Sequence, residues 1–202
     1  MTTTSTNKKF PAILGISGKK YSGKSSVAKI IKEEILPNKK VAIMSFADSL
    51  KGECVLAIRT VLKDFNYEEL EANKETYRGL LQWWGTDFRR KLFGKDYWVN
   101  TIEKVIEKYN YEADLIIIPD VRFANEFEWI KEVHGGQVIY IDRIFNPKSK
   151  GDSHISENLF DMVYFRQRCI TLENAFSLGM LPSLVNKLWN QEQLSRKLNL
   201  EV

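Results

Sequence analysis

The sequence is poor in cysteine and has no long apolar run. Only Cys54 and Cys169 occur, far apart and outside any C-x-x-C pair, which argues against a zinc site or a disulfide framework and favours a reducing compartment. No apolar stretch approaches the ~20 residues that a membrane-spanning helix needs, and the polar start MTTTSTNKKF lacks the apolar centre of a signal peptide. We therefore expect a cytoplasmic protein with no membrane contact, whose residues 1–10 form a disordered tail.

The sequence does contain enough apolar material for one domain. Of the 202 residues, 44% are hydrophobic and 12% aromatic, which predicts a single domain over 11–202. Residues 144–158 have no periodicity and several loop formers, so we expect a lid-like segment there. The net charge of +4 suits small anionic ligands as well as nucleic acid. Because no basic stripe is evident, stable binding to nucleic acid is not expected. The sequence leaves open whether the chain forms a homodimer.

Short apolar segments alternate with segments of helical periodicity. The expected strands cover 11–17, 41–46, 114–120 and 137–143, and the expected helices cover 27–35, 48–65, 74–93, 97–109, 123–133 and 181–198. This alternation predicts a three-layer α/β fold with a mostly parallel sheet and helices on both faces. Ligands bind at the carboxyl ends of such strands. Ser17, Gly18, Asp48, Asp120 and Arg143 are therefore expected to gather on one edge of the sheet.

Residues 18–25 match G-x-x-x-x-G-K-[ST] between an expected strand and an expected helix. Gly18 and Gly23 permit backbone angles that turn successive N–H groups inward around a phosphate, and the helix N-terminus adds partial positive charge. We expect Lys24 to reach the β and γ phosphates and the Ser25 hydroxyl to bind Mg²⁺. This motif binds either ATP or GTP. The predicted ATP-binding residues are Gly18, Lys19, Ser22, Gly23, Lys24, Ser25 and Ser26.

Other motifs narrow the class of phosphate-loop protein. A GTPase needs N-K-x-D for guanine, and the three Asn-Lys pairs of this chain lack the aspartate. A motor or helicase ATPase is usually longer and has an acidic pair after its second motif strand, where this chain reads PDVR at 119–122. The small size and the lid-like segment favour a kinase of small molecules.

Four blocks together resemble the bacteriophage deoxynucleoside monophosphate kinase family: SGKKYSGKSS, LLQWWGTDFRRKLFGKDYWVN, IIIPDVRFANEFEWIKEVHGGQVIYIDR and DSHISE. Their order and spacing also fit the family. The resemblance implies a P-loop kinase fold and transfer of the γ-phosphoryl group of ATP to a deoxynucleoside 5′-monophosphate (dNMP), with Mg²⁺. Such an acceptor is already ionised near neutral pH, so catalysis needs positioning and charge neutralisation rather than a general base.

The same resemblance implies roles for individual residues. The expected catalytic residues are Lys24, Arg122, Arg143 and Asp120, and the expected Mg²⁺ ligands are Ser25 and Asp120. The expected dNMP-binding residues are Lys51, Asp48, Trp83, Asp87, Arg90, Arg122, His154 and Glu157. Either Arg89 or Arg90 can face the site, and Trp83 can equally belong to the core. Tyr97 and Trp98 are expected in the core, and His134 at a helix end without a role.

Two other functions stay open at this point. Related phage kinases phosphorylate a hydroxymethyl group on modified pyrimidines in DNA; that hydroxyl needs a base, for which Asp48 or Asp120 is available. A phosphate-loop protein can also bind nucleotide as a regulatory or assembly module without transferring phosphate to a small acceptor.

Overall fold

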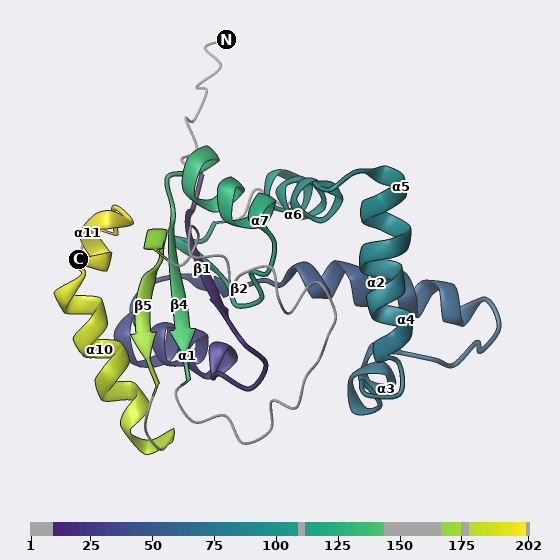
Figure 1. Ribbon diagram of the computed structural model, residues 1–202, viewed down its shortest axis with the longest axis horizontal. Helices are drawn as coiled ribbons and strands as arrows, with labels where there is room; N and C mark the ends of the chain where they lie inside the picture. Colours follow the sequence, from purple (N-terminus) through teal and green to yellow (C-terminus); the bar gives the residue numbers. More distant parts are fainter. Residues whose placement is uncertain (1–9, 109–111, 144–166, 175–177, 201–202) are drawn as a thin grey trace, which may run out of the picture.

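The computed structural model describes residues 10–108, 112–143, 167–174 and 178–200. Within these ranges, five strands form one parallel sheet in the order β2-β3-β1-β4-β5. They are β1 (Ala12–Gly18), β2 (Val41–Ile43), β3 (Leu115–Ile118), β4 (Gln137–Asp142) and β5 (Ile170–Glu173). In Figure 1 the strands run downward, so the turn from β1 into the first helix lies at the lower edge of the sheet.

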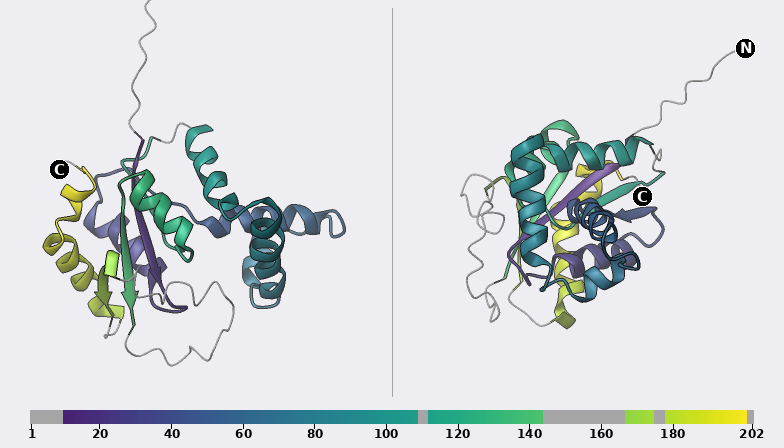
Figure 2. Two further views of the ribbon diagram at one scale, coloured as in Figure 1. Left: turned by 45° about the horizontal axis from the view of Figure 1, so that its top comes forward. Right: turned by 90° about the vertical axis from the view of Figure 1, so that its right-hand side faces the viewer.

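Helices cover both faces of this sheet (Figures 1 and 2). One face packs against α1 (Lys24–Ile30) with its π-helical continuation η1 (Ile31–Ile35), and against α10 (Leu181–Gln191) and α11 (Leu194–Lys197); the short helix η5 (Leu178–Met180) precedes α10. The other face packs against α6 (Tyr97–Lys108) and against α7 (Ala124–Glu128) with its π-helical continuation η3 (Trp129–Val133). Leu14 and Ile16 belong to the first core and Ile13 to the second, because successive side chains of a strand point to opposite faces. The expected three-layer α/β fold is confirmed.

A group of helices, which we call the helical lobe, projects from the sheet on the right of Figure 1. It consists of α2 (Phe46–Arg59), α3 (Tyr67–Ala72), α4 (Arg78–Gln82), the π-helix η2 (Trp83–Arg90) and α5 (Lys91–Phe93). A small core of its own holds it together, made of Cys54, Val55, Phe65, Leu70 and Leu81. The lobe therefore has a core separate from the two cores that cover the sheet.

Several boundaries differ from those expected. The strand expected over 41–46 ends at Ile43, because the Ser45 side chain accepts a hydrogen bond from the Ala47 N–H (3.1 Å) and so starts α2. The expected terminal helix is split at Gln193, whose φ is 49°. Strand β5 and helix α3 were not predicted; only Leu172 of the four β5 residues is buried, so its sequence has no strong strand pattern.

The lid-like segment expected over about 144–158 and nearly all of the expected tail lie outside the described residues. In the part of the chain that the structure describes, no helix is both long and apolar enough to cross a bilayer.

Candidate active site

The turn between β1 and α1 depends on glycine. Gly18 and Gly23 have φ angles of 141° and 102°, and Tyr21 between them has a φ of 63°. Side chains are disfavoured at such angles. A Cβ atom at Gly18 would also lie 2.6 Å from the Ile141 carbonyl oxygen of β4. The first glycine of the predicted phosphate loop (residues 18–25) is thus required by its own backbone and by the neighbouring strand.

Side chains hydrogen-bond to four carbonyl groups of the predicted phosphate loop. Lys24 Nζ donates to the carbonyl oxygens of Gly18 (2.6 Å) and Lys19 (2.7 Å). Arg143 Nη1, at the end of β4, donates to the Tyr21 carbonyl (2.6 Å). Asn174 Nδ2, directly after β5, donates to the Ser22 carbonyl (3.0 Å). Lys24 and Arg143 therefore lie at the loop, and Asn174 was missed because β5 was missed.

Ser25 is exposed on the first turn of α1, next to Lys24. Among the described residues, no group of three His, Cys, Asp or Glu side chains could hold a metal ion. Mg²⁺ in phosphoryl-transfer sites is bound largely by substrate phosphates and water, with only one or two protein ligands. An exposed hydroxyl at the start of this helix fits that kind of site, and Ser25 remains the predicted ligand.

Asp120 anchors the start of α2. Its Oδ2 accepts hydrogen bonds from Ser45 Oγ (2.6 Å) and the Ala47 N–H (2.9 Å), and its Oδ1 accepts one from the Phe46 N–H (3.1 Å). A carboxylate has about four acceptor positions, so these bonds occupy most of them. Asp120 thus joins the carboxyl end of β3 to the helical lobe, a role that the sequence did not suggest. Its contact with Mg²⁺ stays a prediction.

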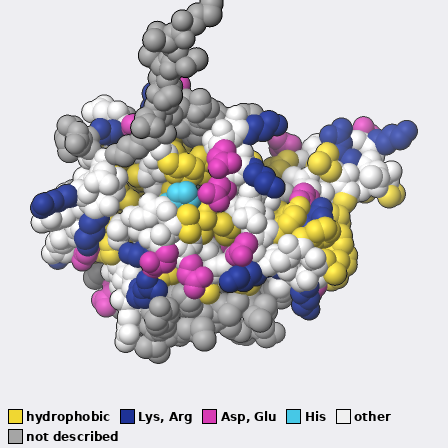
Figure 3. Space-filling view, turned by 90° about the horizontal axis from the view of Figure 1, so that it is seen from above, with side chains coloured by type: hydrophobic (Ala, Val, Ile, Leu, Met, Phe, Trp, Pro, Cys, Tyr) yellow, Lys and Arg dark blue, Asp and Glu magenta, His cyan; other side chains and the backbone are white. Residues whose placement is uncertain are grey.

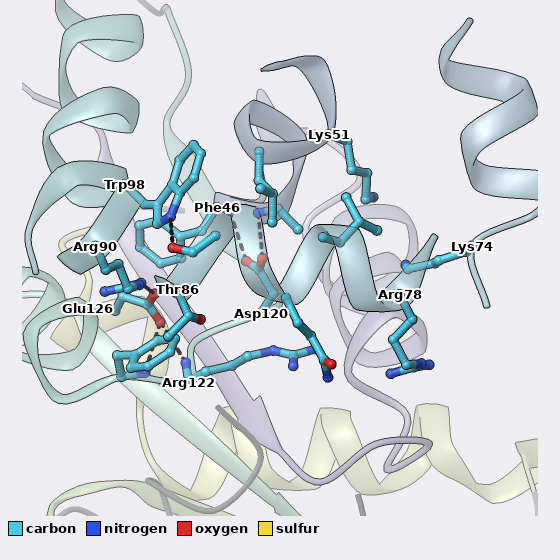
Figure 4. A pocket seen from close by; sticks show the side chains of 16 residues that line it. Phe46, Lys51, Lys74, Arg78, Thr86, Arg90, Trp98, Asp120, Arg122 and Glu126 are labelled. Atoms are coloured by element: carbon cyan, nitrogen blue, oxygen red, sulfur yellow. Dashed lines mark hydrogen bonds and ion pairs between the residues drawn. The ribbon is translucent and has the colours of Figure 1, made fainter. Parts of the chain in front are cut away.

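A pocket opens beside Asp120, between the sheet edge and the helical lobe (Figure 4). Its apolar wall includes Phe46, Leu50, Leu81, Trp98 and Phe123, and its charged wall has five cations, Lys51, Lys74, Arg78, Arg90 and Arg122, against the acids Asp120 and Glu126. We call it the cationic pocket. An apolar wall opposite clustered cations suits a ligand with an aromatic ring at one end and an anion at the other.

The cations of this pocket are crowded. Burial, followed by the charges of Lys51, Arg122 and Arg78, lowers the pKa of Lys74, although Glu71 acts in the opposite direction. The positive charges of these side chains repel one another, and a bound anion would reduce this repulsion. Neither Lys74 nor Arg78 was predicted; only their separation of four residues hinted at a shared surface.

Lys51 is buried and paired with an acid. Its Nζ lies 2.5 Å from Glu71 and 3.1 Å from the Tyr67 hydroxyl. Burial alone would lower the pKa of Lys51, but these hydrogen bonds raise it above its ordinary value. Asp48 accepts a hydrogen bond from Tyr67 (2.9 Å) and lies 3.5 Å from Lys51. Asp48 therefore supports Lys51 from outside the set of residues that line the pocket.

Glu75 connects the pocket to the predicted phosphate loop. Both of its carboxylate oxygens accept hydrogen bonds from Arg78 (2.9 and 2.6 Å), and the Lys20 ammonium lies 3.5 Å from it. The hydrogen bonds from Arg78 lower the pKa of Glu75 to about 2. One exposed carboxylate thus contacts a residue of each site, which places the two sites side by side.

The structure distinguishes the neighbours Arg89 and Arg90. Arg90 lines the pocket, pairs with the buried Glu126, and lies 3.8 Å from the centre of the Phe123 ring. Burial raises the pKa of the Glu126 carboxyl to about 7, which the Arg90 charge and two backbone N–H groups oppose. Arg89 instead binds Glu53 (2.6 Å). Arg90 is therefore the one that faces the site.

Trp83 and Asp87 are not among the residues that line the cationic pocket. Trp83 is half exposed and stacks on Phe88, with ring centres 5.4 Å apart, and Asp87 pairs with Lys91 at 2.5 Å. The reason is helical spacing: Gln82, Thr86 and Arg90 are four residues apart and share the face toward the pocket, so positions 83 and 87 point elsewhere. Trp98, expected only in the core, is both buried and part of the pocket wall.

Neither predicted contact from the DSHISE block can be placed, because His154 and Glu157 lie outside the described residues. His134 lies at the opposite, amino edge of the sheet, beside Ala12, Ile13 and Gly136. Figure 3 shows the molecule from above the view of Figure 1, with histidine in cyan. His134 follows η3 and stacks on Phe10 with ring centres 4.3 Å apart. This position, away from the predicted phosphate loop, agrees with a helix-end residue.

Comparison with known proteins identifies the family. Residues 56–177 match the deoxynucleotide monophosphate kinase family. The chain is 32% identical over 165 residues to a protein of Acanthamoeba polyphaga mimivirus described provisionally as a deoxynucleotide monophosphate kinase, covering 72% of this chain and 80% of that protein. The backbone of this chain is also similar to that of a gluconokinase from Sinorhizobium meliloti 1021, with a TM-score of 0.47 and 14% identity over 94% of this chain and 98% of that chain. This similarity is too distant to bear on function. The chain belongs to the deoxynucleotide monophosphate kinase family, which makes it a nucleotide kinase.

Proposed function

We propose that this protein transfers the γ-phosphoryl group of ATP to a deoxynucleoside 5′-monophosphate. In this proposal the loop of residues 18–25 holds ATP and the cationic pocket holds the acceptor. The observation that carries it is the position of Glu75, which contacts Lys20 of the loop and Arg78 of the pocket. Two anion-binding regions joined by one carboxylate suit two substrates that exchange a phosphoryl group.

The chemistry asks little of a base. A nucleoside monophosphate has a second phosphate pKa of about 6, so its attacking oxygen is ionised at neutral pH. The requirement is to align two phosphates and to neutralise their charge. Lys24 on the donor side and Arg122 on the acceptor side supply charge, and the apolar wall of Phe46, Leu81 and Trp98 positions the nucleoside. When bound, Mg²⁺ on Ser25 would supply further charge at the donor phosphates.

The proposal is tested by following ADP release with ATP and Mg²⁺ while each deoxynucleoside monophosphate is supplied in turn. We expect at least one of them to stimulate release strongly, and Lys24→Ala to abolish it. Ribonucleoside monophosphates, tested in parallel, report on the selectivity for the sugar. Failure of all acceptors to stimulate release would contradict the proposal.

The alternative of a hydroxyl acceptor in DNA requires a general base. The two available aspartates have other partners: Asp120 accepts three hydrogen bonds at the start of α2, and Asp48 is bound by Tyr67. ADP release stimulated by DNA containing hydroxymethyl pyrimidines, and not by free monophosphates, would favour this alternative over our proposal.

A further inference from the structure

The peptide group between Ser22 and Gly23 is held by a side chain from a distant part of the sequence. The Ser22 carbonyl accepts the hydrogen bond from Asn174 Nδ2 at 3.0 Å, across 152 residues of sequence. In a planar trans peptide, the C=O and the following N–H point in opposite directions. A donor that holds the Ser22 carbonyl outward therefore also aims the Gly23 N–H toward the inside of the loop.

This peptide group needs such a restraint. Gly23 has a φ of 102° and no side chain, so its own geometry permits several orientations. It also precedes α1, whose N-terminus has no side-chain cap. The peptide groups on either side have backbone partners, since the Ser22 N–H donates to the Lys19 carbonyl (3.1 Å) and the Gly23 carbonyl accepts from the Val27 N–H (2.9 Å). The carbonyl of the peptide group between them accepts its hydrogen bond from Asn174.

Asn174 itself is fixed by its surroundings. It is 5% exposed, and its backbone N–H donates to the Asp142 carbonyl at the end of β4 (2.8 Å). A Cβ atom at Gly23 would lie 3.3 Å from Asn174 Nδ2, so the amide is packed tightly against the loop. The residue that it serves, Ser22, is 1% exposed. A buried amide with its backbone tied to the sheet is a rigid reference point for a flexible loop.

We propose that Asn174 is a positioning residue for the donor nucleotide: it orients the Gly23 N–H toward the phosphates without touching them. The inference rests on the proposed function, because it takes the loop of residues 18–25 as the ATP site. It also assigns a use to the β5 edge of the sheet, which becomes the support of that site.

The test compares two variants that lack the amide donor. Asn174→Ala removes the amide group, whereas Asn174→Leu keeps the same number and branching of side-chain heavy atoms. Asn190→Ala is the matched control, because Asn190 is exposed on α10 and its amide donates to the Asn186 side chain (3.1 Å). Affinity for a non-hydrolysable ATP analogue with Mg²⁺ and affinity for the acceptor monophosphate are measured by calorimetry. The ¹⁵N chemical shift of Gly23, which responds to the hydrogen bond that the Ser22 carbonyl of the same peptide group accepts, is measured by NMR.

We expect both Asn174 variants to bind the ATP analogue about tenfold more weakly, which equals about 1.4 kcal/mol and is typical of a buried carbonyl that has lost its donor. Acceptor affinity should stay within about twofold of the wild type, the Gly23 ¹⁵N resonance should shift in both Asn174 variants, and Asn190→Ala should change none of these. Unchanged affinity for the analogue, or an equal loss of acceptor affinity, would overturn the inference.

Failure of the proposed function would look different. If the wild-type protein does not bind the ATP analogue, the assignment of the loop as the ATP site is wrong. The Gly23 ¹⁵N chemical shift, measured without nucleotide, would then still decide the role of Asn174, because a shift unchanged by Asn174→Leu would show that Asn174 does not hold this peptide group.

Discussion

Single side chains in this protein take different roles even where the residue type is the same. Arg89 and Arg90 are adjacent in sequence, yet one pairs with Glu53 and the other lines the cationic pocket with Glu126. The buried Lys51 is paired with Glu71 and Tyr67, while Lys74 has its pKa lowered by burial and by its cationic neighbours. At this scale the partner, and not the residue type, decides the chemistry.

Arg122 should be the side chain on which the rate depends most in the pocket. Cations that contact a transferring phosphoryl group are worth about 10³–10⁵ in rate, so Arg122→Ala should lower kcat by three or more orders of magnitude in the ADP-release assay. The variant keeps the hydrogen bond from residue 122 to Glu126, because its donor is the backbone N–H, and thermal unfolding of the variant separates a loss of rate from a loss of fold. Arg59→Ala, at the exposed end of α2, serves as the control. A loss below tenfold would place Arg122 outside the transfer step.

Replacing Glu75 should strengthen acceptor binding. Glu75→Gln removes the negative charge that occupies Arg78 and contacts Lys20, so the pocket becomes more attractive to a phosphate. Because exposed ion pairs are weak, we expect only a modest effect, a fall of about two- to fivefold in the Kd of the monophosphate at low salt. High salt should reduce the difference. The same experiment with Glu68→Gln, on the exposed side of α3, should show no change; a weaker affinity in Glu75→Gln would mean that Glu75 orients Arg78 productively.

At the scale of elements, Glu53 joins three helices of the pocket wall. From α2 it accepts hydrogen bonds from Trp84 Nε1 (2.8 Å) and Arg89 Nε (2.6 Å) of η2 and from the Tyr97 hydroxyl (2.5 Å) of α6. Burial alone would raise the pKa of Glu53, but these three donors lower it below its ordinary value. The carboxylate form of Glu53 is therefore the form that stabilises the lobe.

This lowered pKa predicts a pH dependence of stability. A carboxyl group with a lowered pKa in the folded state contributes stability above its unfolded-state pKa of about 4.3 and loses it as the pH falls through the folded-state value. Glu53→Gln should lower the free energy of unfolding by about 1–3 kcal/mol at pH 7, and the difference from the wild type should shrink below about pH 4. Urea denaturation at several pH values measures this. Glu34→Gln, an exposed position on η1, is the control; a difference that stays constant with pH would contradict the proposed role of the charge.

At the scale of the whole molecule, the contacts of the parallel sheet set the geometry of the site. β1 pairs with β3 on one side and β4 on the other, so the residues after these three strands meet at one edge. The Ser17 hydroxyl donates to the Val121 carbonyl (2.8 Å), which ties the segment carrying Arg122 to the strand that leads into the predicted phosphate loop. Small errors in strand spacing would therefore move both sites.

Two glycine-to-alanine substitutions test whether the spacing of the strands is tightly fixed, and we expect them to change stability in opposite directions. A Cβ at Gly136 would lie 2.4 Å from the Ile13 carbonyl oxygen of β1 and 2.9 Å from Ile130, so Gly136→Ala should push β4 away and cost about 1–3 kcal/mol of stability. Gly52, inside α2, has nothing within 4 Å of an added Cβ, and Gly52→Ala should stabilise by about 0.5–1 kcal/mol. Thermal unfolding measures both. Equal effects of the two substitutions would mean that sheet spacing is not tightly fixed at Gly136.

The sequence by itself determined the parallel sheet, the glycine-dependent turn after β1 and the family. Runs of apolar residues and a loop motif involve residues that are close together in the chain, so they can be recognised without the tertiary structure. It missed β5, Asn174, Lys74, Arg78 and the anchoring role of Asp120. Those features depend on which residues meet at the sheet edge. Ser22 and Asn174 are 152 residues apart, and no sequence periodicity indicates a contact over such a separation. Helical spacing decided between Arg89 and Arg90 and turned Trp83 away from the pocket, but only once the tertiary structure had fixed which face of that helix is covered. The sequence thus specified the elements, and packing decided which polar groups they bring together.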